Sequence, residues 1–374
     1  MKKFIVFFLF FVSIFDFLSA KGFSDSGHIA SSKKHDNDLI HVEARGTGIF
    51  FDRSSDFQIA NTGDWAASIA AQQNGNESQL SYGMNKWGGG YGIDVLLPNK
   101  GLAGMQFSFD QCFMSGKQND LVPGIGAGLL TSMAFIDGKA HGPSNTYGFY
   151  ISAATLGGSN SPGEVNLKYT LNHYMISLAA VCNLWNQDSI AVDLFVGPSY
   201  AVFLQEYLFK TRGNEPTSAT ETTSSTKEQL NDYLFGGEIG FKGKMDIWKG
   251  FFLSLKQDFG LFARHSRFYG RQDIVNGGGM SPAGAFTGLN ALIRTRDFDT
   301  DFTSRFTSNA AFGYDLADWI SIKIFYEFDM WLNLTRIDNI VVSSDLIRQS
   351  SDATRIRGDD LRSSMIGGSA VIKF

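Results

Sequence analysis

Strict alternation of apolar and polar residues along several long segments constrains this chain more than any other feature. Residues 189–209 illustrate it, with apolar side chains at every second position: Ile190, Val192, Leu194, Val196, Tyr200, Val202 and Leu204. The intervening positions include Asp193, Gly197, Ser199 and Gln205. A two-residue period is that of a β-strand with one apolar and one polar face. Because residues 233–247, 253–264, 302–315 and 319–334 repeat the pattern, we predict an all-β fold.

The strands are joined alternately by very short and very long connections. Short connections rich in turn-forming residues occur at 98–101, 186–188, 248–250 and 317–319. This asymmetry is typical of antiparallel strands that close into a transmembrane barrel. We predict ten strands, near residues 40–51, 86–98, 101–114, 163–185, 189–209, 230–247, 250–269, 297–316, 319–336 and 361–374. A further hairpin within 115–160 would give twelve.

Strand length separates a barrel from a soluble β-sandwich, whose strands also alternate. A tilted strand crosses a bilayer in about 9–11 residues, whereas the segment 189–209 is nearly twice as long. The sequence therefore predicts a transmembrane antiparallel β-barrel of 10–12 strands, with short periplasmic turns and long outer loops. We expect outer loops at 52–85, 115–160, 210–229, 270–297 and 337–360. The stretches 210–229 and 277–279 are expected to be mobile.

One strand shows a change of parity. Within 163–185 the apolar positions are odd as far as Leu171 and even from Tyr174 onward. An extra residue in a strand reverses the faces of all residues that follow it. The pattern therefore predicts a β-bulge near Asn172 and His173.

The two cysteines of the chain are Cys112 and Cys182. Export to an oxidising compartment would permit a disulfide. The strand order, however, places Cys112 near the outer end of one strand and Cys182 near the inner end of the next, which is too far for a bond. We predict two free thiols.

The N-terminus predicts export. Two lysines follow Met1, residues 4–15 are almost all apolar, and residues 18–20 are Leu-Ser-Ala, which suits a signal peptidase. The apolar core is shorter than the roughly 20 residues of a spanning helix, and Asp16 interrupts it. We predict a cleaved signal peptide over 1–20, a flexible segment over 21–39 and a single barrel domain over 40–374.

Composition and the C-terminal run agree with a barrel. The chain has 34 Phe, 12 Tyr and 41 Gly but only 7 Pro, which suits many strands with an aromatic exterior and a crowded interior. Residues 366–374 alternate and end on Phe374. The net charge of −5 argues against nucleic acid as a partner.

These features together resemble a Gram-negative outer-membrane β-barrel, in which a terminal phenylalanine such as Phe374 is the signal read by the barrel-assembly machinery. More narrowly, residues 172–178 (Asn-His-Tyr-Met-Ile-Ser-Leu) and 194–200 (Leu-Phe-Val-Gly-Pro-Ser-Tyr) resemble the pore-forming, major-outer-membrane-protein-like families of Legionella and chlamydia-related bacteria. The resemblance implies a location in the bacterial outer membrane, among its lipids. It also implies a porin that allows passive diffusion of small hydrophilic solutes or ions.

Strand parity assigns nearly all strand charges to the barrel interior. Inward placement is expected because Lys or Arg facing lipid at the midplane costs roughly 2–4 kcal/mol. The pore-lining candidates are Glu43, Arg45, Asp193, Glu238, Lys242, Lys244, Lys256, Asp258, Arg264, Arg305, Lys323, Glu327 and Asp329. Two interpretations remain open: separate charged patches could line a water-filled pore, or the charges could pair into a polar core that closes a narrow barrel.

Three tryptophans lie beside predicted tight turns at one end of the barrel. They are Trp185, Trp248 and Trp319. Indole side chains prefer the interface between membrane and water. We predict that these residues form the periplasmic aromatic girdle.

Catalysis and metal binding are weaker hypotheses. His265 and Ser266 are adjacent in one strand and so point to opposite faces, which separates a base from its nucleophile. The pair 359–360, two aspartates, is expected to end a solvated loop. His28, His35 and His41 are irregularly spaced. We therefore expect no enzymatic activity, no catalytic residues, no metal and no cofactor.

Adhesion is the alternative from a different functional class. Barrels whose lumen is plugged act through their loops. The chain would then be a structural barrel that binds a host-cell surface through its outer loops, rather than a porin.

Overall fold

A computed structural model describes most of the chain beyond the N-terminal region. The described residues are 39–53, 57–63, 78–82, 86–98, 103–122, 128–130, 150–152, 163–187, 189–214, 221–281, 284–337 and 356–374. The predicted signal peptide (1–20), the flexible segment as far as residue 38, and most of the turn at 98–101 lie outside them. No helix long and apolar enough to cross a membrane occurs among the described residues.

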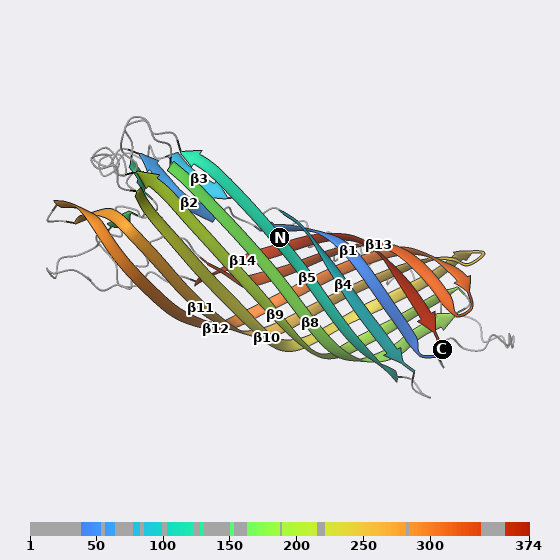
Figure 1. Ribbon diagram of the computed structural model, residues 1–374. Helices are drawn as coiled ribbons and strands as arrows, with labels where there is room; N and C mark the ends of the chain where they lie inside the picture. Colours follow the sequence, from blue (N-terminus) through green and yellow to red (C-terminus); the bar gives the residue numbers. More distant parts are fainter. Residues whose placement is uncertain are drawn as a thin grey trace. The chain divides into compact units, whose positions relative to one another are not determined.

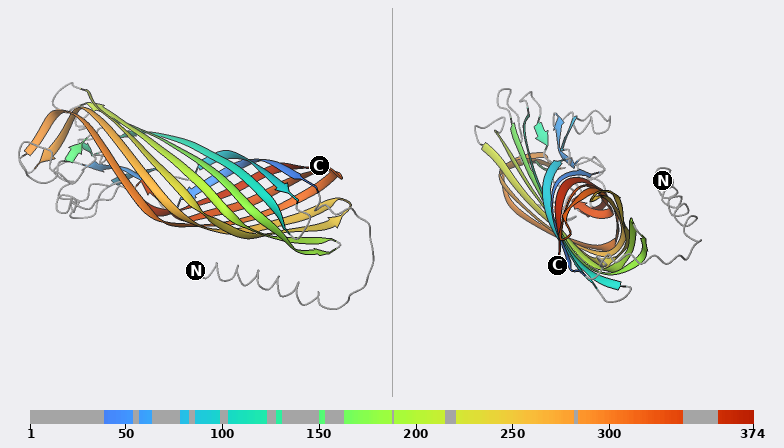
Figure 2. Two further views of the ribbon diagram at one scale, coloured as in Figure 1. Left: turned by 90° about the horizontal axis from the view of Figure 1, so that it is seen from below. Right: turned by 90° about the vertical axis from the view of Figure 1, so that its right-hand side faces the viewer.

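Ten strands form a closed antiparallel barrel, as the sequence predicts (Figures 1 and 2). Each pairs with the next around the ring, and the ring closes where β1 pairs with β14 and β10 with β11. The right-hand view of Figure 2 looks along this cylinder. The strands are β1 (His41–Arg53), β4 (Lys86–Leu97), β5 (Ala103–Val122), β8 (Gly163–Gln187), β9 (Ile190–Asn214), β10 (Glu221–Trp248), β11 (Phe251–Ser281), β12 (Gly284–Ala317), β13 (Ile320–Ile337) and β14 (Ile356–Lys373).

The remaining described strands do not enter the ring. β2 (Phe57–Gly63) pairs with β3 (Ser78–Tyr82) and with β6 (Gly128–Leu130) in a separate small sheet. β7 (Tyr150–Ser152) pairs with the far end of β11. The segment 115–160 therefore contributes short accessory strands, and the count of twelve barrel strands is not realised.

The far ends of the strands are longer than predicted. β9, β10, β11 and β12 have 25, 28, 31 and 34 residues. The described parts of 210–229 and of 270–297 are strand residues rather than the expected loops. The stretch 210–229 is rich in Thr, Ser and charged residues, so it lacks the apolar period by which the other strands were recognised. Backbone pairing continues there without that signal.

Two of the predicted tight turns are observed directly. At the β10–β11 turn, Lys249 and Gly250 both have positive φ, 43° and 88°. Positive φ at both central residues is the type I′ geometry that matches the twist of a two-residue hairpin. The β12–β13 turn lies at residues 318–319, as expected.

The outward faces carry the predicted apolar residues. Exposed side chains on the wall include Val196, Tyr200, Phe235, Ile239, Leu255, Phe259, Phe312, Ile322 and Ile324. An apolar surface of this extent is unfavourable in water, and it forms a band next to the tight turns. We refer to it as the apolar band.

The predicted bulge at Asn172 and His173 is wrong. The β5–β8 register runs without a shift from Ala103 opposite Cys182 to Val122 opposite Gly163. The apolar parity changes because the interior itself changes: Leu167, Tyr169 and Leu171 face inward and are buried. The irregularity in β8 lies instead between Asn183 and Trp185.

A second irregularity in β13 corrects the side assigned to Leu334. The sequence places Leu334 on the outward face with the other even positions of 319–334. The register shifts between Trp331 and Leu334, where Asn333 has a φ of 60°. Leu334 is consequently buried in the interior.

Both cysteines are free, as predicted. Cys112 on β5 lies opposite His173, whereas Cys182 lies opposite Ala103 at the other end of the same strand pair. Strand geometry therefore separates the two thiols.

Candidate functional site: the barrel interior

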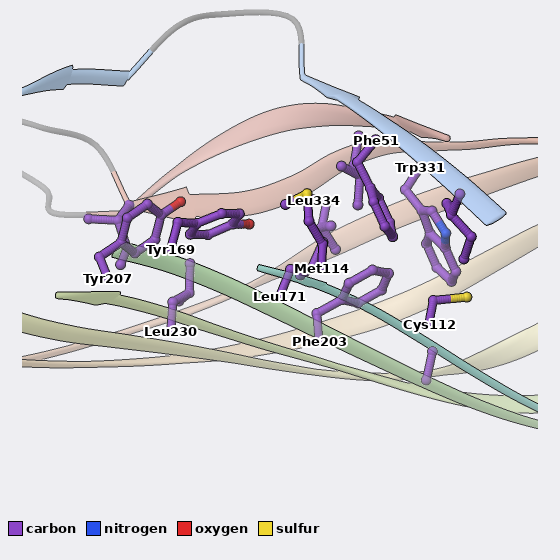
Figure 3. Close-up of a cluster of buried hydrophobic side chains, with 14 of the residues drawn as sticks. Phe51, Cys112, Met114, Tyr169, Leu171, Phe203, Tyr207, Leu230, Trp331 and Leu334 are labelled. Carbon is purple, nitrogen blue, oxygen red and sulfur yellow. The ribbon is translucent and has the colours of Figure 1, made fainter. Parts of the chain in front are cut away.

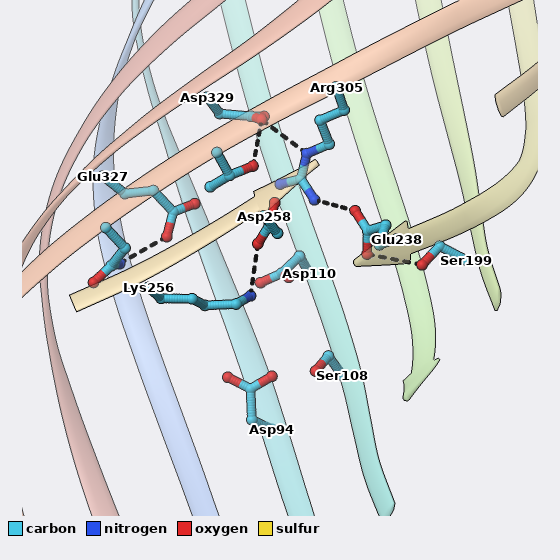
Figure 4. A network of polar contacts seen from close by, with 12 residues as sticks. Asp94, Ser108, Asp110, Ser199, Glu238, Lys256, Asp258, Arg305, Glu327 and Asp329 are labelled. Carbon is cyan, nitrogen blue, oxygen red and sulfur yellow. Dashed lines mark hydrogen bonds and ion pairs between the residues drawn. The ribbon is translucent and has the colours of Figure 1, made fainter. Parts of the chain in front are cut away.

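The described interior contains two layers of different chemistry. The ionic layer comprises Arg45 and eight further residues that Figure 4 labels: Asp94, Asp110, Glu238, Lys256, Asp258, Arg305, Glu327 and Asp329. The aromatic layer comprises His173, Phe203, Phe262 and Trp331; Figure 3 shows two of its members, Phe203 and Trp331. Along β11 and β13 the ionic residues lie nearer the tight turns than the aromatic ones.

Arg305 is the central cation of the ionic layer. Its Nε donates to Asp329 Oδ1 at 2.8 Å, and its Nη1 donates to Glu238 Oε1 at 2.8 Å. Ser199 and Thr307 hydroxyls donate to the same two carboxylates, at 2.8 Å and 3.0 Å. Buried charges are tolerated only when they are paired and hydrogen-bonded, and this network meets both conditions.

Arg45 forms a second centre in the ionic layer. It lies 3.1 Å from Asp94 and donates to Asp110 through Nε at 2.9 Å and through Nη2. Lys256 pairs with Asp258 at 3.1 Å. Charges from β1, β4, β5 and β11 are therefore compensated locally rather than left facing an open lumen.

Both arginine centres reach across an intervening strand at a glycine. Gly260 lies between Glu238 and Arg305 in the register, and Gly92 lies between Arg45 and Asp110. A Cβ at Gly92 would approach Asp110 Oδ1 to 2.2 Å and Arg45 Nε to 2.5 Å. Absence of a side chain at this position is what allows the arginine and the carboxylate to meet over the middle strand.

The aromatic layer closes the interior above the ionic layer. The His173 and Phe203 rings are stacked with centroids 4.1 Å apart, and Trp331 contacts Phe203 and Phe262 at 5.1 Å and 5.2 Å. Trp331 is 1% exposed, and its Nε1 donates to Asp329 Oδ2 at 2.9 Å. Arg305 lies over the Trp331 ring at 5.3 Å. The two layers are thus joined, and the aromatic layer sits in a larger buried apolar cluster that includes Tyr169, Tyr207 and Leu334.

Among the described residues, two small polar cavities lie beside the ionic layer. The larger, about 40 Å³, is lined by the bases Arg45, Lys242, Lys256 and Lys323 and by the acids Glu43 and Asp94, among other residues. The smaller, about 20 Å³, lies beside Ser199 and Glu238. A water molecule needs roughly 10–15 Å³ of such volume. Each of these volumes is room for a few waters.

The structure brings most of the predicted interior residues together. Glu43, Arg45, Glu238, Lys242, Lys256, Asp258, Arg305, Lys323, Glu327 and Asp329 belong to the ionic layer or the larger cavity. Three others lie apart: Asp193 accepts from Asn183 at 2.8 Å, Lys244 lies 3.3 Å from Asp246, and Arg264 lies 2.6 Å from Asp299.

Sequence reasoning missed the aromatic layer. Two of its members, Phe262 and Trp331, follow charged inward residues, Asp258 on β11 and Asp329 on β13. The available signal was the parity change in β8, which marks where the interior turns from polar to apolar.

The remaining sequence candidates lie at the turn end of the ring or on its wall. Trp248 and Trp319 are 62% and 59% exposed, and Trp185 is half-buried. Phe374 is exposed, and its backbone N–H donates to the Ile40 carbonyl at 2.9 Å. Their assignment to an aromatic girdle and an assembly signal stays a prediction.

The residues weighed for catalysis do not converge. Ser266 is buried and bonded to Thr335, whereas His265 contacts Thr300 on the outer wall at 3.3 Å. Asp359 lies in β14 and pairs with Arg336 at 3.4 Å, so it does not end a loop. Among the described residues, no group of three or more His, Cys, Asp or Glu could hold a metal ion.

Comparisons with known proteins support the fold at a coarse level. No known protein family and no curated protein matches the chain. The outer-membrane protease OmpT of Escherichia coli is 9% identical over 94% of this chain and 100% of its own, with a TM-score of 0.39. A FadL homologue of Pseudomonas aeruginosa is 7% identical over 89% and 90%, with a TM-score of 0.22. The outer-membrane protein OmpT of Vibrio cholerae is 10% identical over 93% and 100%, with a TM-score of 0.14.

These matches correct one expectation. The sequence predicted that the chain is not an enzyme, and this is overturned because one of the barrels that it resembles is a protease. Similarity at this level carries no particular activity to this chain. The chain has the fold of an outer-membrane β-barrel.

Proposed function

We propose that the protein is an outer-membrane barrel whose lumen is closed to free diffusion and which acts through its outer strand ends and loops. The observation that carries this is the ionic layer joined to the aromatic layer through Arg305, Asp329 and Trp331. Opening such a lumen would separate buried ion pairs, and removing one partner of a buried pair costs about 3–5 kcal/mol. A permanently open porin is the less favoured function for this geometry.

Strand length supports an external role. β10, β11 and β12 are 28, 31 and 34 residues long, whereas about 9–11 residues cross a bilayer. A large part of the wall therefore extends past the apolar band. Such an extension, with the loops it carries, offers surface for binding a host cell or another external partner.

A gated path for ions or small hydrophilic solutes is the second candidate. The specific observation is the larger cavity, which four basic and two acidic side chains line. If the aromatic layer moved aside, this excess of positive charge would favour anions. Transport would then require a conformational change, unlike passive diffusion through an open porin.

Single-channel recording tests both functions. The protein, extracted from membranes in folded form, is reconstituted in a planar bilayer under a salt gradient. We expect no conductance from the wild type, with folding verified by heat-modifiable electrophoretic mobility. Stable ohmic steps from the wild type would overturn the closed-barrel proposal.

Removal of the aromatic layer distinguishes the second candidate. Trp331→Ala with Phe203→Ala takes away the contacts that separate the ionic layer from the outer part of the barrel. Conductance in this variant with an anion-selective reversal potential would support a gated path. Silence in both proteins, with loss of cell-surface binding when residues 338–355 are deleted, would support the external role.

A further inference from the structure

Two exposed arginines lie close together on the outer wall, on neighbouring strands. Arg267 on β11 and Arg296 on β12 face outward and are exposed, beyond the apolar band. In the register Arg267 lies opposite Phe298, and Tyr269 lies opposite Arg296. The two guanidinium groups therefore flank Phe298 on one face of neighbouring strands. We call these three residues the outer basic patch.

The partners of these arginines are aromatic rather than acidic. In the interior, Arg45, Arg264 and Arg305 each lie within 4 Å of two carboxylates. By contrast, neither Arg267 nor Arg296 pairs with a carboxylate in the part of the chain that the structure describes. Their charge is consequently available to an anion from outside the protein.

Ring contacts hold both guanidinium groups in place. Arg267 lies over the Tyr233 ring at 5.7 Å, and its Nε donates to His265 Nε2 at 3.1 Å. Arg296 lies over the Tyr269 ring at 5.8 Å. Stacking on a ring orients an arginine without using all of its N–H groups. The terminal N–H groups remain able to form the two parallel bonds that bind a phosphate.

The apolar surroundings of the outer basic patch favour an amphiphilic ligand, with a charged head group and an apolar chain. Phe298 is 77% exposed, and Phe302, four residues nearer the apolar band on the same face of β12, is 64% exposed. Phe235 and Leu261 continue the apolar surface on β10 and β11. An acyl chain lying along this surface would bring an attached phosphate to the level of the two arginines. A soluble anion would gain nothing from the exposed phenylalanines.

We propose that the outer basic patch binds the phosphate group of an anionic membrane lipid, whose acyl chain packs on Phe298 and Phe302. The proposal rests on the placement of the apolar band in the outer membrane but not on the closed lumen. A failure of the lipid-binding proposal is therefore distinguishable from a failure of the proposed function, because conductance measurements test only the proposed function.

Equilibrium binding of a fluorescent bis-phosphorylated glycolipid, lipid A, tests the site. The full folded protein in neutral detergent is titrated, alongside the variant Arg267→Gln with Arg296→Gln. Each arginine near an anionic lipid surface is worth about fivefold in affinity, so we expect about 30-fold weaker binding in the double variant. Arg271→Gln is the matched control, because Arg271 lies on the same face but pairs with Asp273 at 3.0 Å. It should bind within about twofold of the wild type.

Two competitors separate lipid from free anion. Inorganic phosphate should leave lipid binding unchanged, and the variant Phe298→Ser should weaken it. Full competition by inorganic phosphate would overturn the lipid assignment, as would equal binding of lipid A and a neutral phosphatidylcholine. If the double arginine variant binds lipid A as well as the wild type does, and its heat-modifiable mobility shows that it is folded, then the outer basic patch is not the binding site.

Discussion

Arg305 connects its own strand, β12, to three others and joins both layers of the interior. It bonds Glu238 and Asp329, lies 3.1 Å from Met175 Sδ and covers the Trp331 ring. The charge on this one side chain compensates two buried carboxylates. A change at Arg305 thus affects polar and aromatic contacts together.

Arg305→Met is expected to lower the free energy of unfolding by about 3–5 kcal/mol, because it leaves Glu238 and Asp329 buried without their cation. Urea unfolding of the folded barrel, followed by tryptophan fluorescence, measures the change. Arg271→Met is the control, since its exposed pair with Asp273 is worth about 0–1 kcal/mol. Adding Glu238→Gln and Asp329→Asn to Arg305→Met should recover part of the loss; no recovery would contradict the charge argument.

At this scale the sequence predicted which charges face inward but not how they pair. Parity along a strand is local, and it placed Arg45, Glu238 and Arg305 inside. Pairing depends on the register between strands, which no single segment specifies. Bonds such as Arg45 to Asp110 cross a strand, so they could not be deduced from neighbours in the chain.

Among the elements, β4 has a glycine at the position where side chains of its two neighbouring strands meet across it. Its inward residue Gly92 lies under the contact between Arg45 and Asp110. β1 has an equivalent small residue, Gly46, on the outward face, where a Cβ would meet nothing within 4 Å. The two glycines therefore have opposite tolerance to a methyl group.

Gly92→Ala should destabilise the barrel by about 1–3 kcal/mol through steric overlap with both ionic partners. Gly46→Ala should be neutral within about 0.5 kcal/mol. The midpoint of urea unfolding, compared for the two variants, checks this. Equal midpoints would mean that the contact between Arg45 and Asp110 rearranges around the added methyl group without a loss of stability.

Element boundaries show where the sequence pattern fails. Alternation identified the ten strands where one face meets the apolar band and the other meets the ionic layer. Beyond the band, in β9 and β10, the alternation is lost and the strands were read as loops. In β8, apolar residues on the inward face produced the same sequence pattern as a bulge. A change in apolar parity can arise either because the side chains change face or because the interior changes from polar to apolar.

Side chains fill the part of the ten-stranded ring that the structure describes, in keeping with the second of the two interpretations left open by the sequence. Eight strands are filled by side chains alone, and sixteen or more leave a channel. Here long charged side chains and large rings occupy the described interior. Access of water to buried groups is a direct measure of that filling.

Cys112 reports on access because it is buried in the apolar cluster. In a Cys182→Ser background, a charged maleimide should label folded protein far more slowly than urea-unfolded protein. Trp331→Ala with Phe203→Ala should accelerate labelling, since both rings belong to the same cluster. Fast labelling of the folded protein without these changes would indicate a water-filled lumen.

The seam between β1 and β14 sets an order of events for making this molecule. His41 pairs with Lys373, so the partners that complete the ring lie almost the whole length of the chain apart. Until these two strands pair, a partly assembled ring has two unpaired strand edges, each able to add a strand from another chain. The export that the N-terminus predicts would therefore require both edges to be shielded until β1 pairs with β14, after which each edge is hydrogen-bonded to the other.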